Sequence, residues 1–347
     1  MRRPPRVLAI ESSCDETAAA VVDGSLVRSS VVATQVEVHA PFGGIVPELA
    51  SRHHLGSVVP VIEAALERAG MEIAEVDALA VTEGPGLVGA LLIGVQVARG
   101  IAAATGLPLY GVHHMEGHVF SAFLGDAEQA VTDFEPHLAL LVSGGHTELC
   151  EVAGVGRYRV MGSTRDDAVG EAFDKVAKLL GLSYPGGPVI DRLAAEGDPK
   201  AVTFPRAMLE RDNLEFSFSG LKTAVAVYVD QHGQPGSRQV LADVCASFQA
   251  AVVEVLIAKL RQARRKAGTS LVTIVGGVSA NRGLRAALER AATKDGFEVR
   301  MPPLRYCGDN AAMIGGAAAL RWSAGLVPEP PVEVYASLGL DEGRARP

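Results

Sequence analysis

Short apolar runs rich in β-branched residues alternate with longer stretches of helical periodicity along the first 120 residues. The first three runs are separated by the polar segments CDET and DGS, which predicts a meander of three strands. The predicted strands are 6–10, 18–22, 26–32, 78–82 and 107–112, and the predicted helices are about 46–69, 88–104 and a segment after His114. This alternation is typical of an α/β domain.

The pattern of the chain's beginning returns near residue 131. HLALLVSGGHTELCEVAG repeats the strand, polar turn, strand and turn of RVLAIESSCDETAAAVVDG, so that Ile10 aligns with Leu141 and Ser12 with Ser143. The later predicted elements are helices at 167–180, 189–195, 220–229, 241–267, 281–292 and about 309–321, and strands at 271–275 and 297–300. A duplicated chain predicts two similar α/β lobes with a ligand cleft between them, where polar turns follow strand ends. We expect one lobe to hold 1–130 and about 308–340, and the other to hold 131–307.

Composition narrows the class of protein. With 347 residues, 48% hydrophobic and 21% charged, the chain is neither disordered nor fibrous. The net charge is −8, whereas a stand-alone nucleic-acid binder usually has a basic surface. A nucleic-acid role would therefore need local basic patches or other subunits. Four cysteines without a CxxC pair favour reduced thiols and a cytoplasmic location. We expect no membrane segment and no signal peptide, because the uncharged stretch 84–98 is too short to span and contains glycines.

The strongest metal signal is HHMEGH at 113–118. His114 and His118 are four residues apart and would share one face of a helix, where such a pair can hold one cation. A hydrogen-bonded pair of histidines without a metal is as common, so a third ligand would decide. The HExxH motif of zinc proteases places its glutamate directly after the first histidine, whereas Glu116 lies one position later.

Glycine-rich turns follow four predicted strands: ESSCDET, EGPG, VSGGHT and VGGVSANRG. Glycines let the backbone approach an anion and leave N–H groups free, so together these turns suggest phosphate contacts. The segment from Gly84 to Gly89 matches GxGxxG, but the acidic residue expected about 20 positions on is missing, which argues against a nicotinamide cofactor. The absence of GxxxxGK[ST] excludes a P-loop NTPase. Asp174 and Asp191 lie on predicted helices, where single carboxylates are usually solvent-facing, but the YPGGP turn between them makes them candidates.

Eight motifs together resemble a known family, the universal tRNA threonylcarbamoyladenosine transferases, formerly described as O-sialoglycoprotein endopeptidases. They are ESSCDET (11–17), HHMEGH (113–118), VSGGHT (142–147), GEAFDKVAKLLGL (170–182), YPGGP (184–188), FSFSGLKT (216–223), GGVSANRGLR (276–285) and CGDNAAMIG (307–315). The resemblance runs from about residue 6 to residue 324 in order and spacing. ESSCDET is similar to the bacterial and organellar branch.

The resemblance implies a fold of the actin, sugar-kinase and Hsp70 type, with two ribonuclease-H-like lobes. It implies transfer of the threonylcarbamoyl group from threonylcarbamoyl-AMP to N6 of adenosine 37, forming t6A in tRNAs that read codons beginning with A. It also implies a shortened paralogue and a small P-loop ATPase as partners. The metal ligands would be His114, His118 and Asp309, holding one divalent metal per chain, usually iron, with zinc also seen.

The family's ligand contacts fall on nine residues of this sequence: Leu141, Val142, Ser143, Gly144, Gly145, Asp174, Gly187, Asp191 and Asn281. We expect the two aspartates to accept hydrogen bonds from the nucleotide, the glycines to allow close approach, and Asn281 to cap its helix, bind the ligand or do both. We assign no general base, and His146 is a candidate for that role.

Two other functions stay open from the sequence. An ATP-dependent small-molecule kinase uses the same fold class, but it would hold Mg²⁺ mainly through oxygen ligands rather than through two histidines and an aspartate. A non-catalytic nucleotide-binding scaffold would tolerate alanine at His114. The protease interpretation ranks last, because Glu116 is misplaced for a base.

Overall fold

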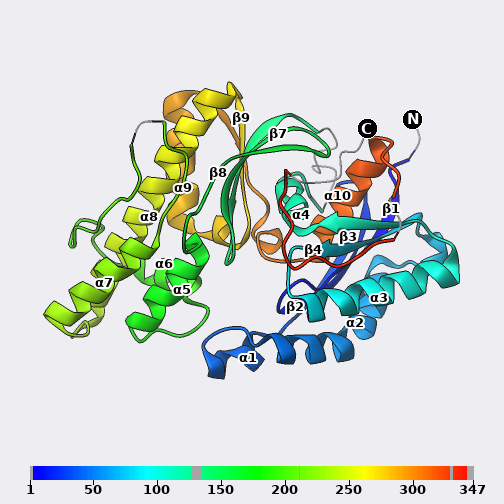
Figure 1. Ribbon diagram of the computed structural model, residues 1–347, viewed down its shortest axis with the longest axis horizontal. Coiled ribbons are helices and arrows are strands. Elements are labelled where there is room, and N and C mark those ends of the chain that lie inside the picture. The colour runs from blue at the N-terminus through cyan, green and yellow to red at the C-terminus, as the bar shows by residue number, and fades with distance from the viewer. Residues whose placement is uncertain (1–2, 127–133, 211, 329–330, 342–347) are drawn as a thin grey trace. The chain divides into compact units, whose positions relative to one another are not determined.

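A computed structural model describes residues 3–126, 134–210, 212–328 and 331–341 of the protein (Figure 1). It divides into two compact units, of which the first comprises Met1–Glu135, Val152–Arg159 and Pro302–Pro347. The second comprises Pro136–Glu151 and Val160–Met301. The expected lobe boundary at 130/131 lies outside the described residues.

A five-stranded sheet of order β3-β2-β1-β4-β5 forms the first unit. Its strands are β1 (Arg6–Glu11), β2 (Glu16–Asp23), β3 (Leu26–Thr34), β4 (Ala78–Gly84) and β5 (Leu109–His113). β1 pairs antiparallel with β2 and parallel with β4, and β4 pairs parallel with β5. Every residue of β4 is buried, as expected for a parallel strand covered on both faces.

Alternate residues of β1 face two different layers of helices. Leu8 and Ile10 belong to an apolar core shared with α2 and α3, which pack against each other. Ala9 faces α10, where a methyl group at Gly315 would lie 3.2 Å from the Ala9 Cβ, so glycine lets the helix lie close to the sheet. The helices of this unit are α1 (Val36–His39), α2 (Pro47–Ala69), α3 (Val88–Thr105), α4 (His114–Ser121) and α10 (Ala311–Ser323), with short 3₁₀ turns at Ala40–Phe42, Ile73–Glu75 and Leu304–Tyr306.

The second sheet repeats the topology of the first. Its order is β10-β9-β6-β7-β8, so β6, β7, β8, β9 and β10 take the places of β1, β2, β3, β4 and β5. The strands are β6 (His137–Val142), β7 (Thr147–Gly154), β8 (Arg157–Ser163), β9 (Leu271–Val275) and β10 (Glu298–Arg300). The duplication inferred from the sequence is therefore confirmed, including the alignment of β1 with β6.

Helices of the second unit pack on a large apolar core. Phe173 of α5 and Phe248 of α8 make an edge-to-face ring contact at 5.1 Å inside it. The helices are α5 (Val169–Leu179), α6 (Gly186–Ala194), α7 (Ser219–His232), α8 (Arg238–Ala267) and α9 (Arg282–Asp295), with a 3₁₀ turn at Gly277–Ala280 (Figure 1).

By length and composition alone, α3 and α8 would each be long and apolar enough to cross a membrane. In α8 61% of the most apolar window is buried inside the structure, and in α3 28% is. Core helices of soluble proteins can meet the same criterion, and α8 contributes ten buried side chains to the core of the second unit. Length and composition alone are therefore weak evidence that either helix spans a membrane.

Candidate functional site

Three neighbouring parallel strands of the first sheet bring polar side chains to one edge. Ile10 of β1 pairs with Val81 of β4, so Glu11 and Thr82 come next to each other where these strands end. β5 pairs with β4 and ends at His113, which places His114 beside them. Carboxyl ends of parallel strands meet at the same edge of a sheet, and this edge commonly carries functional groups in open α/β folds.

The histidine pair lies on α4, as the spacing predicts. His113 is the N-cap residue, and its Nδ1 accepts a hydrogen bond from the Met115 N–H. His114 and His118 follow one turn apart and are both buried, and their rings meet edge to face with centroids 4.8 Å apart. The short helix therefore places both imidazoles on one face, His114 at its start and His118 in its last turn.

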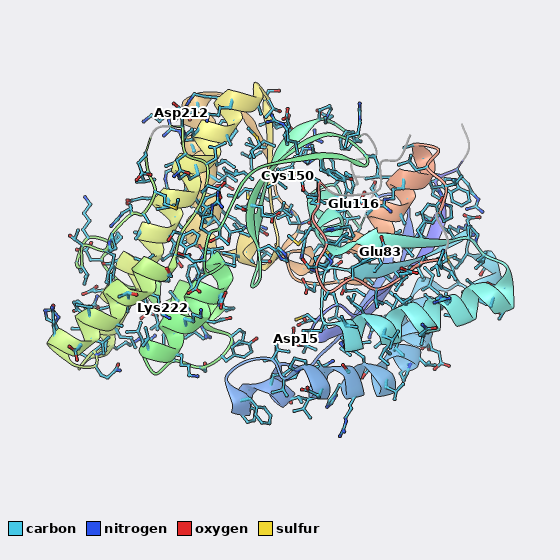
Figure 2. All side chains as sticks on the ribbon, viewed as in Figure 1. Asp15, Glu83, Glu116, Cys150, Asp212 and Lys222 are labelled. Atoms are coloured by element: carbon cyan, nitrogen blue, oxygen red, sulfur yellow. The ribbon has the colours of Figure 1, made fainter. Side chains whose placement is uncertain are left out.

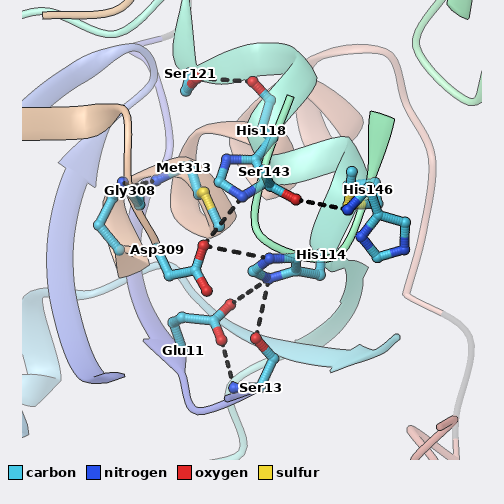
Figure 3. Close-up of polar contacts among 12 residues, drawn as sticks. Glu11, Ser13, His114, His118, Ser121, Ser143, His146, Gly308, Asp309 and Met313 are labelled. Carbon is cyan, nitrogen blue, oxygen red and sulfur yellow. Dashed lines mark hydrogen bonds and ion pairs between the residues drawn. The ribbon is translucent and has the colours of Figure 1, made fainter. Parts of the chain in front are cut away.

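Asp309 supplies the third group from the other end of the sequence. It lies just before α10, whose N-cap Asn310 accepts a hydrogen bond from the Met313 N–H. Asp309 Oδ1 is 3.1 Å from His118 Nε2 and 3.5 Å from His114 Nε2 (Figure 3). One ligand atom from each of the three residues lies within 4.8 Å of the others. The structure thus brings together the three predicted metal ligands.

The charged groups of this buried cluster shift one another's pKa values. Burial alone would lower the pKa of His114, but the carboxylates of Asp309 and Glu11 outweigh it and raise that pKa well above its usual value. Burial would raise the pKa of Asp309, yet His114 beside it and the hydrogen bonds from both histidines hold that pKa well below its ordinary range. The pKa directions therefore favour the charged forms of His114 and Asp309, although burial alone disfavours them.

The donor set fits a transition metal. Two imidazole nitrogens and one carboxylate oxygen form the borderline ligand set that suits zinc or ferrous iron, and three protein ligands leave positions open for a substrate. The Nδ1 atom of His118 is buried and has no hydrogen-bond partner in the described part of the chain. His114, His118 and Asp309 therefore form a possible metal site.

Glu116 lies between the two histidines in the sequence but takes part in a different network. Tyr158 donates a hydrogen bond of 2.6 Å to Glu116 Oε1, and Arg321 Nη2 lies 2.5 Å from Glu116 Oε2. Figure 2 labels Glu116 on α4 of the first unit. A fully buried carboxylate held by a guanidinium and a phenol is not available as a base for water. The structure therefore agrees with the low rank of the protease interpretation.

Cys14, in the ESSCDET turn, is not an activated nucleophile. Burial and the nearby Asp15 raise the pKa of its thiol well above the usual value, so it stays protonated at neutral pH. All four cysteines are free, as their spacing predicts.

A cavity of about 610 Å³ lies in the second unit and gathers five of the nine predicted ligand residues. Gly144, Asp174, Gly187, Asp191 and Asn281 line it. Arg192, Arg282 and Val278 also line it, and the sequence analysis did not single these three out; Gly277, expected with Gly276 to let the backbone approach the nucleotide, lines it as well. The signal for Arg192 was its position directly after Asp191, on the helix that YPGGP opens.

The polar groups around this cavity already have protein partners. Asp174 Oδ1 accepts a hydrogen bond of 2.7 Å from the Gly186 N–H, which ties α5 to the start of α6. Asp191 Oδ2 lies 2.8 Å from Arg282 Nε, and Gln249 donates to its other oxygen. Each carboxylate is thus oriented by the protein before any ligand binds, and each oxygen can accept a further hydrogen bond.

Asn281 caps α9, which was one of the expected roles. Its Oδ1 accepts a hydrogen bond from the Leu284 N–H, and its amide nitrogen donates to Gln249 Oε1. The side chain is nearly fully buried, yet it reaches the cavity wall. Asn281 therefore both caps α9 and lines the cavity.

Four predicted ligand residues do not line the cavity. Leu141 and Val142 are fully buried residues of β6. Ser143 closes the SGGH turn, since its N–H donates to the His146 carbonyl and its Oγ accepts from the His146 N–H (Figure 3). Gly145 is exposed on that turn. The roles of these residues stay predictions.

Comparison with known proteins decides the family. The family model described as tRNA N6-adenosine threonylcarbamoyltransferase matches residues 26–316. The chain belongs to this family. A tRNA N6-adenosine threonylcarbamoyltransferase from Trichlorobacter lovleyi is 53% identical over 337 residues, which is 97% of each chain. Another of the same name from Anaeromyxobacter dehalogenans is 56% identical over 314 residues, covering 90% of this chain and 92% of the relative.

Solved structures confirm the fold class predicted from the sequence. A HypF structure in the phosphate- and nucleotide-bound form has a TM-score of 0.62 at 13% identity, covering 93% of this chain and 47% of that one. The activator of 2-hydroxyisocaproyl-CoA dehydratase from Clostridium difficile has a TM-score of 0.53 at 12% identity, covering 94% and 99%. The protein therefore has the α/β fold of the actin, sugar-kinase and Hsp70 type. As a member of the tRNA N6-adenosine threonylcarbamoyltransferase family, it is a transferase that modifies tRNA.

Proposed function

We propose that this transferase moves the threonylcarbamoyl group of threonylcarbamoyl-AMP to N6 of adenosine 37 and releases AMP, forming t6A in tRNAs that read codons beginning with A. The cluster of His114, His118 and Asp309 in a member of this family is the observation that carries the proposal. A kinase of the same fold would hold Mg²⁺ through carboxylates, water and phosphates. The two histidines favour chemistry at a carbonyl or phosphate held by a borderline metal.

His114, His118 and Asp309 would hold one divalent ion, ferrous iron in preference to zinc. Such an ion would supply positive charge to polarise the carbamoyl carbonyl or to orient the adenylate phosphate. The residues themselves set which positions of the ion stay open. Both Nε2 atoms lie within 3.5 Å of Asp309 Oδ1, so the three residues would hold the ion where these atoms meet.

The cavity in the second unit would take the adenosine part of the donor. Asp174 and Asp191 would accept hydrogen bonds from ribose hydroxyls or the adenine amino group, and each is held in place by protein donors. Gly187 lines the cavity, and a methyl group added there meets no atom of the described chain within 4 Å. Its missing side chain therefore leaves room for a ligand and serves no packing need.

Loop N–H groups of the segment Leu141–Gly145 would stabilise negative charge that develops during attack by N6. Gly144 and Gly145 are exposed on the turn, and a methyl group at either meets nothing within 4 Å in the described chain. Adenine N6 is a weak nucleophile, so positioning and charge stabilisation would supply most of the acceleration. His146, on the same turn, is the candidate acceptor for the N6 proton. Adenosine 37 would have to be unstacked to reach the site.

The protein would work in the cytoplasm with two companions, a shortened paralogue and a small P-loop ATPase. Two pairs of exposed apolar side chains support docking of the paralogue on the first unit. Leu55 and Val59 lie one turn apart on α2, and Val88 and Leu92 lie one turn apart on α3, which packs against α2. The net charge of −8 is also consistent with a tRNA surface that is completed by other subunits.

Nucleoside mass spectrometry tests the proposal. An ANN-decoding tRNA is incubated with threonylcarbamoyl-AMP, this protein and its companions, beside a His114→Ala variant shown to be folded. We expect t6A with the wild-type protein and its loss in the variant. Unmodified tRNA in the presence of active companions would refute the transfer, and ATP turnover would then test the kinase alternative. Transfer that survives in the His114→Ala protein would instead favour a scaffold role for this chain.

A further inference from the structure

Glu11, which contacts the candidate metal ligand His114, is a fully buried carboxylate that the proposed function does not use. Glu11 Oε2 is 3.1 Å from His114 Nδ1, the ring nitrogen that faces away from Asp309 (Figure 3). His114 Nε2 faces Asp309 Oδ1 at 3.5 Å. The imidazole is thus held between a carboxylate on one nitrogen and the ligand centre on the other.

Glu11 is itself fixed in position by the sheet. Thr82 donates a hydrogen bond of 2.5 Å to Glu11 Oε2, and the Ser13 N–H donates to Oε1. The pairing of β1 with β4 sets Glu11 beside Thr82, so the Thr82 contact follows from the backbone register, and the Ser13 contact comes from the turn directly after β1. Both oxygens therefore face donors, and the acceptor offered to His114 is oriented before any metal binds.

We infer that Glu11 is a positioning residue for the metal, holding His114 as the tautomer with its proton on Nδ1 and its Nε2 lone pair directed at the ion. This inference rests on the metal role proposed above for His114. A carboxylate that accepts the second ring proton of a histidine ligand fixes the ring and raises its basicity as a ligand. His118 has no comparable acceptor, since its Nδ1 lacks a partner in the described residues. Glu11 therefore makes His114 the better oriented of the two imidazoles.

Ser13 is the competing acceptor and provides the matched control. Its Oγ lies 3.2 Å from the same His114 Nδ1. A charged acceptor forms the stronger hydrogen bond, so the carboxylate should dominate. The Glu11→Gln variant keeps the shape, but its single carbonyl oxygen cannot accept from both the Ser13 N–H and His114. Ser13→Ala removes the hydroxyl and leaves Glu11 in place.

Zn²⁺ affinity of the full chain, measured by competition with a chromophoric chelator, tests the inference without tRNA or donor. We expect Glu11→Gln to raise the Zn²⁺ dissociation constant about 10- to 100-fold. Ser13→Ala should leave it near the wild-type value. In the zinc-loaded protein, ¹⁵N spectra of labelled histidine should show a protonated Nδ1 on His114 and lose that signature in Glu11→Gln. Thr82→Val, which keeps Glu11 but removes the hydroxyl that orients it, should give an intermediate loss of affinity.

Several results would overturn the inference. An unchanged dissociation constant in Glu11→Gln, even with a lower melting temperature, would show that Glu11 only stabilises the fold. An equal loss in Ser13→Ala would assign the acceptor role to the hydroxyl. A wild-type protein that binds no Zn²⁺ would remove its basis. Tight Zn²⁺ binding that depends on Glu11 in a protein that transfers nothing would refute the proposed function and leave this inference standing.

Discussion

His118 Nε2 and Asp309 Oδ1 lie 3.1 Å apart, although 191 residues separate them in the chain. The contact joins the last turn of α4 to the residue before the N-cap of α10, so one metal would link two distant segments of the first unit. We therefore expect His118→Ala and Asp309→Ala to lose most of the bound metal, measured by elemental analysis of the purified protein. His53→Ala, which changes an exposed histidine on α2, is the control and should keep its metal. Full metal content in both site variants would contradict the assignment.

The ion pair between Glu116 and Arg321 should contribute to stability as a unit. Both groups are largely buried, and Arg321 also donates a hydrogen bond to the Gly111 carbonyl. Removing one partner leaves an uncompensated buried charge, so Arg321→Met should lower the free energy of unfolding by about 3–5 kcal/mol.

Combining Arg321→Met with Glu116→Gln should recover part of that loss, because neither charge then remains. Chemical denaturation of the four proteins gives the coupling energy. Additive effects of the two substitutions would show that the pair is not coupled.

Two glycines near the cavity should respond in opposite ways to alanine. Gly187 has open space around a new methyl group, so Gly187→Ala should change stability by less than about 0.5 kcal/mol. The same methyl group enters the cavity and should weaken donor binding about tenfold or more, a change of about 1.4 kcal/mol.

Gly276 has φ +91°, and a Cβ there would lie 2.5 Å from the Val142 carbonyl oxygen. Gly276→Ala should therefore destabilise the second unit by about 1–3 kcal/mol. Calorimetry and equilibrium binding of a non-hydrolysable adenylate separate the two effects. If Gly187→Ala binds the adenylate as tightly as the wild-type protein does, the cavity is not the donor site.

Asp166 should stabilise the start of α7 in a pH-dependent way. It accepts hydrogen bonds from the hydroxyls of Ser217 and Ser219 and from the N–H groups of Phe218 and Ser219. Burial alone would raise the pKa of Asp166, but these hydrogen bonds hold it below its usual value. A lowered pKa means that the stabilisation is present above the unfolded-state pKa of about 3.9 and is lost as the pH falls through the folded-state value.

Asp166→Ala should therefore lower the free energy of unfolding by about 1 kcal/mol at neutral pH. The difference from the wild-type protein should shrink below about pH 4. Thermal unfolding at several pH values measures it, and a difference that stays constant with pH would contradict the role of the ionised carboxylate.

The fold was predictable because β1, β4, β6 and β9 are short, mainly apolar runs bounded by turn residues. The duplicated meander could be read from the alignment of Ile10 with Leu141, and the equivalent strand orders of the two sheets confirm it. The predicted ends of the helices and strands were less accurate. YPGGP was interpreted as a rigid turn, whereas α6 begins at Gly186 inside it, because Asp174 accepts the N–H of Gly186 there.

The site was predictable only where the residue spacing within one motif determines which side chains share a face. The spacing of His114 and His118 places both rings on one helix face, and the structure agrees. Asp309 came from the resemblance to a family, since nothing in its local sequence indicates a contact with α4. Glu11 was not singled out, because its contact with His114 depends on the order and register of β1, β4 and β5. Long-range strand pairing of this kind leaves no local pattern in a sequence.

The most direct test of the central claim is metal-dependent t6A formation by chelated and reloaded protein. Metal is removed, Fe²⁺ is titrated back under anaerobic conditions, and t6A at position 37 is quantified by mass spectrometry of tRNA fragments in the presence of the donor and companions. We predict that t6A rises in proportion to bound Fe²⁺ up to one ion per chain, and that Asp309→Ala stays inactive throughout. Full transfer by the metal-free protein, or by Asp309→Ala, would contradict the account.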